Sequence, residues 1–154
     1  MKSFSKALNY AFLLLRFRPR SEFEIRTRLK KRKVPLSVIK EVINYLKDAN
    51  YINDQEFIKS YIDSCLAKGW GPMKANLKLK EFGISVKLRS QALEQIENKS
   101  QKLIDDLIEK KINYLRESAP GLEKNKIKAK LVRYLAAKGF YYKDIYIHLN
   151  NKFD

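Results

Sequence analysis

The chain has 154 residues, of which 45 % are hydrophobic and 12 % aromatic, enough apolar side chains for a folded core. Lys and Arg number 33 against 17 Asp and Glu, so the formal net charge is +16 and an anionic partner is expected. The 5 Gly and 4 Pro are too few for a turn-rich β-sandwich or barrel, and the single Cys and single His exclude an internal disulfide and a multi-histidine metal cage.

Apolar residues recur with helical spacing along nearly the whole chain. The first stripe covers residues 4–15 at positions i, i+3, i+4 and i+7. Similar stripes cover residues 38–46, 58–66, 88–96 and 104–115. Ser21 with Glu24, and Asn53 with Glu56, have the spacing of capping boxes that begin helices. No alternating run of four or more residues is typical of a strand, so the sequence predicts an all-α fold.

Short segments rich in helix-breaking residues interrupt these stripes and predict about nine helices. The breaks lie at residues 19–20, 34–35, 51–53, 69–72, 82–85, 98–100, 119–121 and 139–141. Most of them contain Pro, Gly, Asn or Ser, which favour turns over the interior of a helix. We therefore expect short connections between neighbouring helices.

One pattern occurs three times along the chain. Its copies are Ile25-Leu29-Lys33-Val34, Ala75-Leu79-Gly83-Ile84 and Leu131-Leu135-Gly139-Phe140. The third position suits the residue just after a helix, where Gly adopts a left-handed conformation freely, and the fourth returns to the core. Lys33 is the exception and is expected to be strained there. The pattern predicts three tandem three-helix, helix-turn-helix-like repeats, at residues 1–51, 52–99 and 100–154, stacked into a solenoid-like body.

The excess positive charge lies in three blocks that coincide with the second helix of each repeat and its flanks. Residues 16–33 hold nine bases and two acids, residues 74–89 five bases and one acid, and residues 124–138 six bases and no acid. The rest of the chain is nearly neutral, with 13 bases and 14 acids. This segregation favours a long polyanion or an acidic protein surface as the partner.

Eleven basic residues of these blocks are candidates for contact with a partner. They are Arg16, Arg18, Arg20, Arg26, Lys30, Lys33, Lys74, Lys78, Lys126, Lys130 and Arg133. Lys126, Lys130 and Arg133 recur at i, i+4 and i+7 and share one helix face without an acid, and a stripe of the same spacing starts at Arg26. Each stripe is either a binding face or a helix face that only contacts solvent.

The only tryptophan, Trp70, lies in the segment G-W-G-P at residues 69–72. An exposed Trp in a loop can stack on a base or act as a hot spot in a protein interface. The alternative, which we favour, is that it fills the junction between two repeats. The same alternatives hold for Tyr141 and Tyr142, for which packing is again the favoured interpretation.

Catalytic chemistry has little support in the sequence. A Gly-rich phosphate loop, a Cys/His metal spacing and a nucleophile motif are all missing from it, so we expect no enzyme, no metal and no cofactor. Cys65 lies on an apolar stripe and His148 in the last helix, which predicts a core residue and a surface or half-buried residue. The longest apolar run is far too short to span a membrane, and we expect a cytoplasmic protein.

Three motifs resemble the RecX family of recombinase regulators, over residues 7–149. They are R-P-R-S-E at residues 18–22, Y-I-N-D at 51–54 with K-G-W-G-P at 68–72, and K-G-F at 138–140 followed by D-I at 144–145. Their order and spacing together make the resemblance specific. Lys33, Asn53 and Ala75 depart from the residues usual in that family.

The resemblance implies an elongated, curved, right-handed or solenoid-like body of three repeats. It also implies a monomer that binds the RecA filament in its groove and inhibits ATPase activity and strand exchange, modulating recombination, DNA repair and the SOS response. Weaker binding to single- or double-stranded DNA, direct or indirect, is implied too. Capping of a filament end and insertion into the groove are both open. The charge alone supports an alternative: a non-enzymatic, sequence-tolerant DNA-binding or architectural protein.

Overall fold

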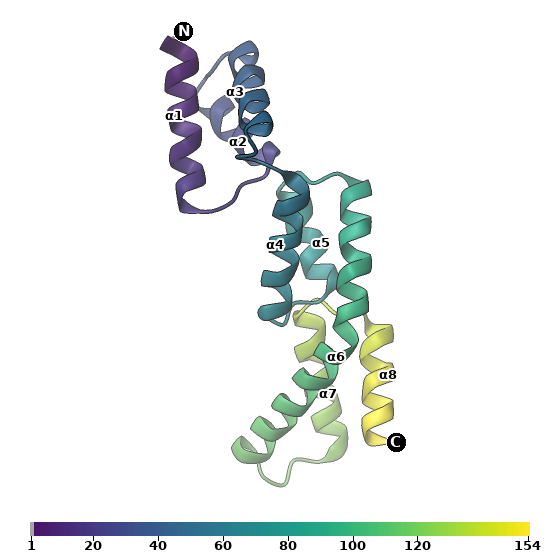
Figure 1. Cartoon of the computed structure of the whole chain (residues 1–154). Helices are drawn as coiled ribbons and strands as arrows, with labels where there is room; N and C mark the ends of the chain where they lie inside the picture. The colour runs from purple at the N-terminus through teal and green to yellow at the C-terminus, as the bar shows by residue number, and fades with distance from the viewer. Residues whose placement is uncertain (1) are drawn as a thin grey trace. The chain divides into compact units, whose positions relative to one another are not determined.

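The computed structural model describes residues 2–154, and over this range the fold consists of helices without any strand (Figure 1). The helices are α1 (Lys2–Phe17), α2 (Glu22–Lys31), α3 (Leu36–Asp48), α4 (Asp54–Ala67), α5 (Pro72–Glu81), α6 (Val86–Ser118), α7 (Lys124–Ala137) and α8 (Tyr142–Phe153). The predicted all-α fold is confirmed. The chain forms two compact units: the first comprises residues up to Tyr61 with Leu79–Arg89, the second Ile62–Lys78 with Ser90–Asp154.

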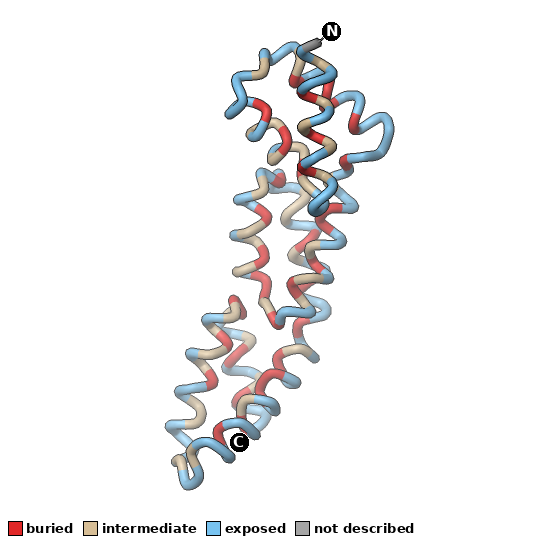
Figure 2. Tube along the Cα trace, turned by 90° about the vertical axis from the view of Figure 1, so that its left-hand side faces the viewer, coloured by how far each residue is buried: buried red, intermediate tan, exposed pale blue. Residues whose placement is uncertain are grey.

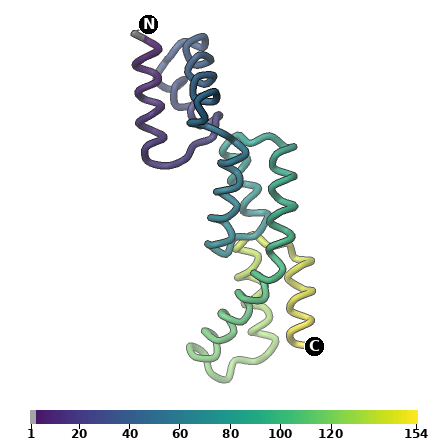
Figure 3. The backbone as a smooth tube through the Cα atoms, in the orientation of Figure 1, coloured from purple at the N-terminus to yellow at the C-terminus, as the bar shows by residue number. Residues whose placement is uncertain are grey.

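The expected helix break at residues 98–100 is wrong, and residues 2–154 hold eight helices instead of about nine. Helix α6 runs through this segment without interruption, as the trace in Figure 3 shows. Ser100 is buried, and its hydroxyl donates to the carbonyl oxygen of Glu97 at 2.9 Å, which satisfies the hydroxyl inside the helix. Without a Gly or Pro in α6, a short polar run is too weak a signal to end it. The predicted boundary at residues 99–100 falls inside α6, and the repeat boundaries stay predictions.

The core of the first unit is built from α1, α2 and α3. Small residues of α1, Ala7 and Ala11, are buried against long apolar side chains of the other two helices. The buried residues of this cluster are Ala7, Ala11, Leu14, Ile25, Leu29, Ile39, Val42, Ile43, Leu46 and Ile52. Buried and exposed residues alternate along the helices (Figure 2). Burial of these side chains leaves the charged faces of the helices in solvent.

Five helices, α2, α3, α4, α5 and α7, end in the same way. The residues that follow their last turn have positive φ angles, between 58° and 93°, and are Lys33, Asn50, Gly69, Gly83 and Gly139. In α2 the amide of Lys33 donates to the carbonyl of Lys30 at 2.8 Å, and the amide of Val34 to that of Leu29 at 3.2 Å. This pair of bonds defines the Schellman motif. The predicted role of the third pattern position is confirmed, including the strained conformation of Lys33.

The start of α2 confirms the predicted capping box and joins α2 to the end of α5 within the first unit. Ser21 Oγ accepts from the amide of Glu24 at 3.2 Å, and the amide of Ser21 donates to Glu24 Oε2 at 2.9 Å. The same hydroxyl donates to the carbonyl of Phe82 at 2.7 Å. Ser21 is fully buried, so this serine both begins the helix and ties the two segments together.

In the second unit, the C-terminal half of α6 packs with α7 and α8. The buried residues of this cluster are Ile104, Leu107, Ile108, Ile112, Leu131, Leu135, Phe140, Ile145 and Leu149. His148 of α8 is half-buried and lies between two side chains of α6, 2.6 Å from Asp105 Oδ1 through Nδ1 and 2.6 Å from Gln101 Oε1 through Nε2. These contacts make His148 a link between α8 and α6.

Candidate anion-binding surfaces

Two of the candidate arginines in the first unit surround one carboxylate. Arg18 forms a bidentate ion pair with Glu24, with Nη1 3.3 Å from Oε2, and Nη1 of Arg20 lies 3.7 Å from Oε1. The Arg18 guanidinium also lies 5.6 Å from the centre of the Phe82 ring. Burial, together with the charge of Arg18, lowers the pKa of Arg20. Both arginines therefore stabilise the start of α2, and a partner would compete with Glu24 for them.

Arg26 is likewise held by an acid of its own helix. Its Nε and Nη2 lie 3.0 and 2.8 Å from Glu22 Oε1, and Lys47 Nζ lies 3.1 Å from Glu22 Oε2. Burial by itself raises the pKa of Glu22, but the hydrogen bonds from Arg26 and Lys47 outweigh it, so the pKa lies below its ordinary value. In the basic stripe that begins at Arg26, the charge of Arg26 itself is therefore neutralised by Glu22.

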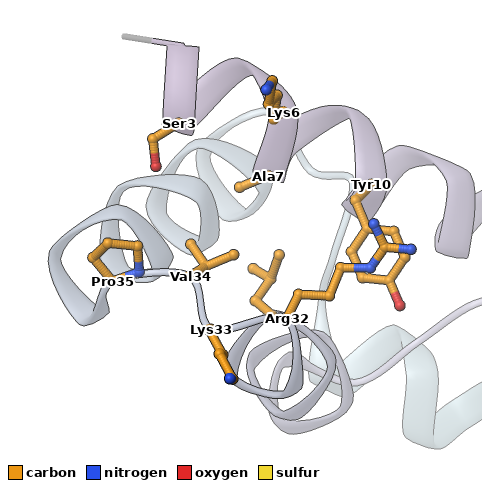
Figure 4. A pocket seen from close by; sticks show the side chains of 9 residues that line it. Ser3, Lys6, Ala7, Tyr10, Arg32, Lys33, Val34 and Pro35 are labelled. Carbon is orange, nitrogen blue, oxygen red and sulfur yellow. The ribbon is translucent and has the colours of Figure 1, made fainter.

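The remaining first-unit candidates, Arg16, Lys30 and Lys33, are exposed. Lys33 also lines a pocket of about 430 Å³ between α1 and the α2–α3 connection (Figure 4). The pocket is lined by Ser3, Lys6, Ala7, Tyr10, Leu29, Arg32, Lys33, Val34 and Pro35. The guanidinium of Arg32 lies 3.8 Å from the centre of the Tyr10 ring. Three cations and no carboxylate line this pocket, so its rim can accept an anionic group.

In the second unit, Lys126, Lys130 and Arg133 are all exposed on α7, a helix that contains no acidic residue. Their spacing places them on one face, as the sequence indicates. Lys74 and Lys78 of α5 are half-buried. The second unit therefore presents a basic helix face that internal acids of α7 do not neutralise.

Trp70 is half-buried, and two lysines contact its ring. The ammonium groups of Lys68 and Lys74 lie 4.7 and 4.5 Å from the centre of its ring. Tyr134 makes cation–π contacts of the same kind: its ring centre is 5.7 Å from Lys138 Nζ and 5.0 Å from Lys111 Nζ. Lys111 also lies 4.9 Å from the Tyr114 ring. We refer to Lys68, Trp70, Lys74, Lys111, Tyr114, Tyr134 and Lys138 as the lysine–aromatic strip.

Two loops of the second unit are joined at this strip. The amide of Gly71 donates to the carbonyl of Lys138 at 2.8 Å, and the amide of Met73 donates to the carbonyl of Gly139 at 2.9 Å. A Cβ on Gly71 would lie 2.6 Å from the carbonyl carbon of Gly139, so only glycine permits this approach. Lys138 Nζ in turn lies 3.4 Å from the carbonyl oxygen of Lys68. The joint brings together lysines that are 70 residues apart.

Lys74 and Trp70 of this strip are among the residues predicted from the sequence, whereas Lys68, Lys111 and Lys138 are not. A signal for two of them was present, because K-G-W at residues 68–70 and K-G-F at 138–140 place a Lys directly before a helix-ending Gly. That signal does not show that the two lysines meet in space.

No group of three or more His, Cys, Asp or Glu side chains able to hold a metal ion occurs in the described part of the chain. Cys65 is fully buried, which confirms its prediction as a core residue. Among the helices of residues 2–154, none is long and apolar enough to cross a membrane.

Comparison with known proteins reveals clear relatives. Residues 7–46 match the family model for the first three-helix domain of RecX. Regulatory protein RecX of Haemophilus influenzae (strain PittEE) is 28 % identical over 138 residues, which cover 88 % of each chain. Regulatory protein RecX of Bacillus velezensis is 44 % identical over 80 residues, 51 % of this chain and 30 % of that protein. The crystal structure of RecX from Lactobacillus salivarius superimposes with a TM-score of 0.83 at 26 % identity, covering 97 % of this chain and 96 % of that one.

Proposed function

Because the chain belongs to the RecX family of regulatory proteins, we propose that it binds the RecA recombinase filament and inhibits its ATPase and strand-exchange activities. Through this inhibition it modulates homologous recombination and DNA repair in the cytoplasm. The observation that carries the proposal is the similarity to RecX from Lactobacillus salivarius over 97 % of this chain. The repeats act in this proposal by binding, without a chemical step.

The exposed cations support an anionic or DNA-wrapped partner. Arg16, Lys30 and Lys33 of the first unit are exposed, as are Lys126, Lys130 and Arg133 of the second. A cluster of like charges on one helix face is destabilising by a few tenths of a kcal/mol per pair, an effect that an anionic partner would reverse. Clusters in both units allow several weak contacts to form together.

Several linked contacts explain how weak surface charges could give tight binding. An exposed ion pair contributes about 0.2–1 kcal/mol, so no single lysine decides the affinity. Once one unit is bound, the other is held at high effective concentration near its own site. Binding of this kind inhibits the filament by blocking either its conformational cycle or the addition of subunits, through groove insertion or end capping.

The test is a titration of RecA ATPase activity on single-stranded DNA, with and without a large excess of free single-stranded DNA. We expect inhibition at stoichiometric protein that persists in the presence of excess DNA. Inhibition that disappears with excess DNA would mean that the protein only competes for DNA, which would favour the alternative DNA-binding or architectural function. No inhibition at all would refute both the ATPase claim and the proposed mechanism.

A matched pair of variants tests the role of the α7 face. The triple variant Lys126→Gln, Lys130→Gln, Arg133→Gln removes three exposed cations from that face. The control replaces three exposed lysines outside the basic blocks: Lys40→Gln, Lys59→Gln and Lys99→Gln. We expect the first variant to weaken inhibition about tenfold and the control to weaken it less than about threefold. Equal losses would show that only net charge matters.

A further inference from the structure

The ammonium groups of the lysine–aromatic strip lack carboxylate partners within residues 2–154. Lys68 and Lys74 lie over Trp70, Lys138 and Lys111 over Tyr134, and no ion pair to these four lysines occurs in the described chain. By contrast, Lys47, Lys128 and Lys152 all form ion pairs with acids. Four like charges held near one another repel, and an anionic ligand would relieve that repulsion.

The strip is ordered before any ligand binds. The hydrogen bonds of Gly71 to Lys138 and of Met73 to Gly139 fix the backbones that carry Lys68, Lys74 and Lys138. Cation–π contacts then restrict the ammonium groups themselves. A preorganised set of cations loses less side-chain entropy on binding than free lysines would.

The chemistry of the strip favours phosphate over carboxylate. Arginines bind carboxylates of this chain in a forked geometry, as Arg18 binds Glu24 and Arg26 binds Glu22, whereas lysines bind them through a single ammonium group, as Lys128 binds Asp154. The cations of the strip are all lysines, whose compact charges suit the single charge of each phosphodiester in a nucleic-acid backbone. Lys130, four residues before Tyr134 on the same face of α7, extends the row of cations. Several neighbouring cations match a ligand that carries one negative charge on each repeating unit.

The aromatic rings of the strip contact lysine ammonium groups, and we do not expect them to stack on bases. The ring of Trp70 is already in contact with two ammonium groups, and that of Tyr134 with two more. We infer that the lysine–aromatic strip binds the sugar–phosphate backbone of DNA without reading its bases, with Trp70 as the positioning residue for Lys68 and Lys74. DNA binding is already the alternative function of this chain, and the inference assigns it a site and a mode that does not depend on the bases. Its tests contain no RecA, so they succeed or fail independently of the proposed RecA inhibition.

The first test measures fluorescence anisotropy of a labelled 20-nucleotide oligo(dT) with the full chain over a series of salt concentrations. The double variant Lys74→Gln, Lys138→Gln is expected to bind about tenfold more weakly and to reduce the magnitude of the salt slope by about 1 to 1.5. The control Lys99→Gln, Lys102→Gln removes the same charge from exposed positions of α6 in the same unit. Equal effects of the two variants would overturn the inference.

The second test changes the ligand. An abasic 20-mer, which keeps the sugar–phosphate backbone, is expected to bind within about threefold of oligo(dT), and polyglutamate of the same charge about tenfold more weakly. Because Trp70 is the only tryptophan, its emission reports directly on occupancy of the strip. Loss of affinity for the abasic ligand would identify base stacking instead. Equal affinity for polyglutamate would identify an acidic-protein surface, and either result refutes backbone binding.

The third test separates positioning from charge. Trp70→Leu keeps the net charge but removes the ring that holds Lys68 and Lys74, and we expect about fivefold weaker binding of labelled oligo(dT). Trp70→Phe retains an aromatic face and is expected to restore most of that affinity. Helical content measured by circular dichroism shows whether each variant is folded. Folded Trp70→Leu protein with unchanged affinity would refute the positioning role.

Discussion

Substitution of Gly71 by Ala tests the joint between the two loops of the second unit. A Cβ at this position would lie 2.6 Å from both the carbonyl carbon and the oxygen of Gly139, and 2.7 Å from the amide nitrogen of Phe140. All three are backbone atoms and cannot rotate away, so the loops must separate. Separation weakens two inter-loop hydrogen bonds, each contributing about 0.5–1.5 kcal/mol, in addition to steric strain of about 1–3 kcal/mol. We expect a destabilisation of about 3 kcal/mol.

Gly121→Ala provides the matched control for this prediction. Gly121 has a φ of 84°, but nothing lies within 4 Å of its added Cβ, so only the cost of left-handed backbone remains, about 1–2 kcal/mol. Urea unfolding of both variants is followed by Trp70 emission, which reports on the second unit, and by circular dichroism. A Gly71→Ala variant within about 0.5 kcal/mol of the parent, or less destabilised than Gly121→Ala, would refute the close approach of the loops.

Two further predictions concern the first unit. The pKa of Glu22 is lowered in the fold, so its ionised form stabilises the folded state at pH values above its ordinary pKa of 4.5. This contribution, about 1 kcal/mol or less, is lost as the pH falls below that value. Urea unfolding at pH 7 and pH 3 checks this, and Glu22→Gln should show a smaller difference between the two; an equal difference would contradict it. Lys33→Gly should stabilise the fold by about 0.5–1 kcal/mol because φ is 58° there. Lys31→Gly, at the last residue of α2, should destabilise it by up to about 1 kcal/mol in the same measurement. Destabilisation by Lys33→Gly would contradict the strain at this position.

Features that depend on neighbouring residues could be predicted from the sequence. The capping box of Ser21 with Glu24 and the left-handed residues after α2, α5 and α7 follow from spacing within one or two helical turns. The break expected at residues 98–100 was wrong because a helix tolerates a polar run of three residues that contains no Gly or Pro. Asn50, another left-handed residue, was missed because Asn signals this conformation less strongly than Gly.

The sequence by itself determined the helical fold, most helix ends, the family resemblance and the blocks of basic charge. Only the tertiary structure decided which cations are available to a partner, since Arg18 and Arg26 form ion pairs with acids of α2. It also brought Lys138 next to Lys68, 70 residues away, at a loop joint that Gly71 permits. The physical reason is the separation over which each kind of interaction acts. Helix periodicity and capping act between residues a few positions apart, whereas neutralisation of a charge depends on distance in space and on how closely two backbones approach.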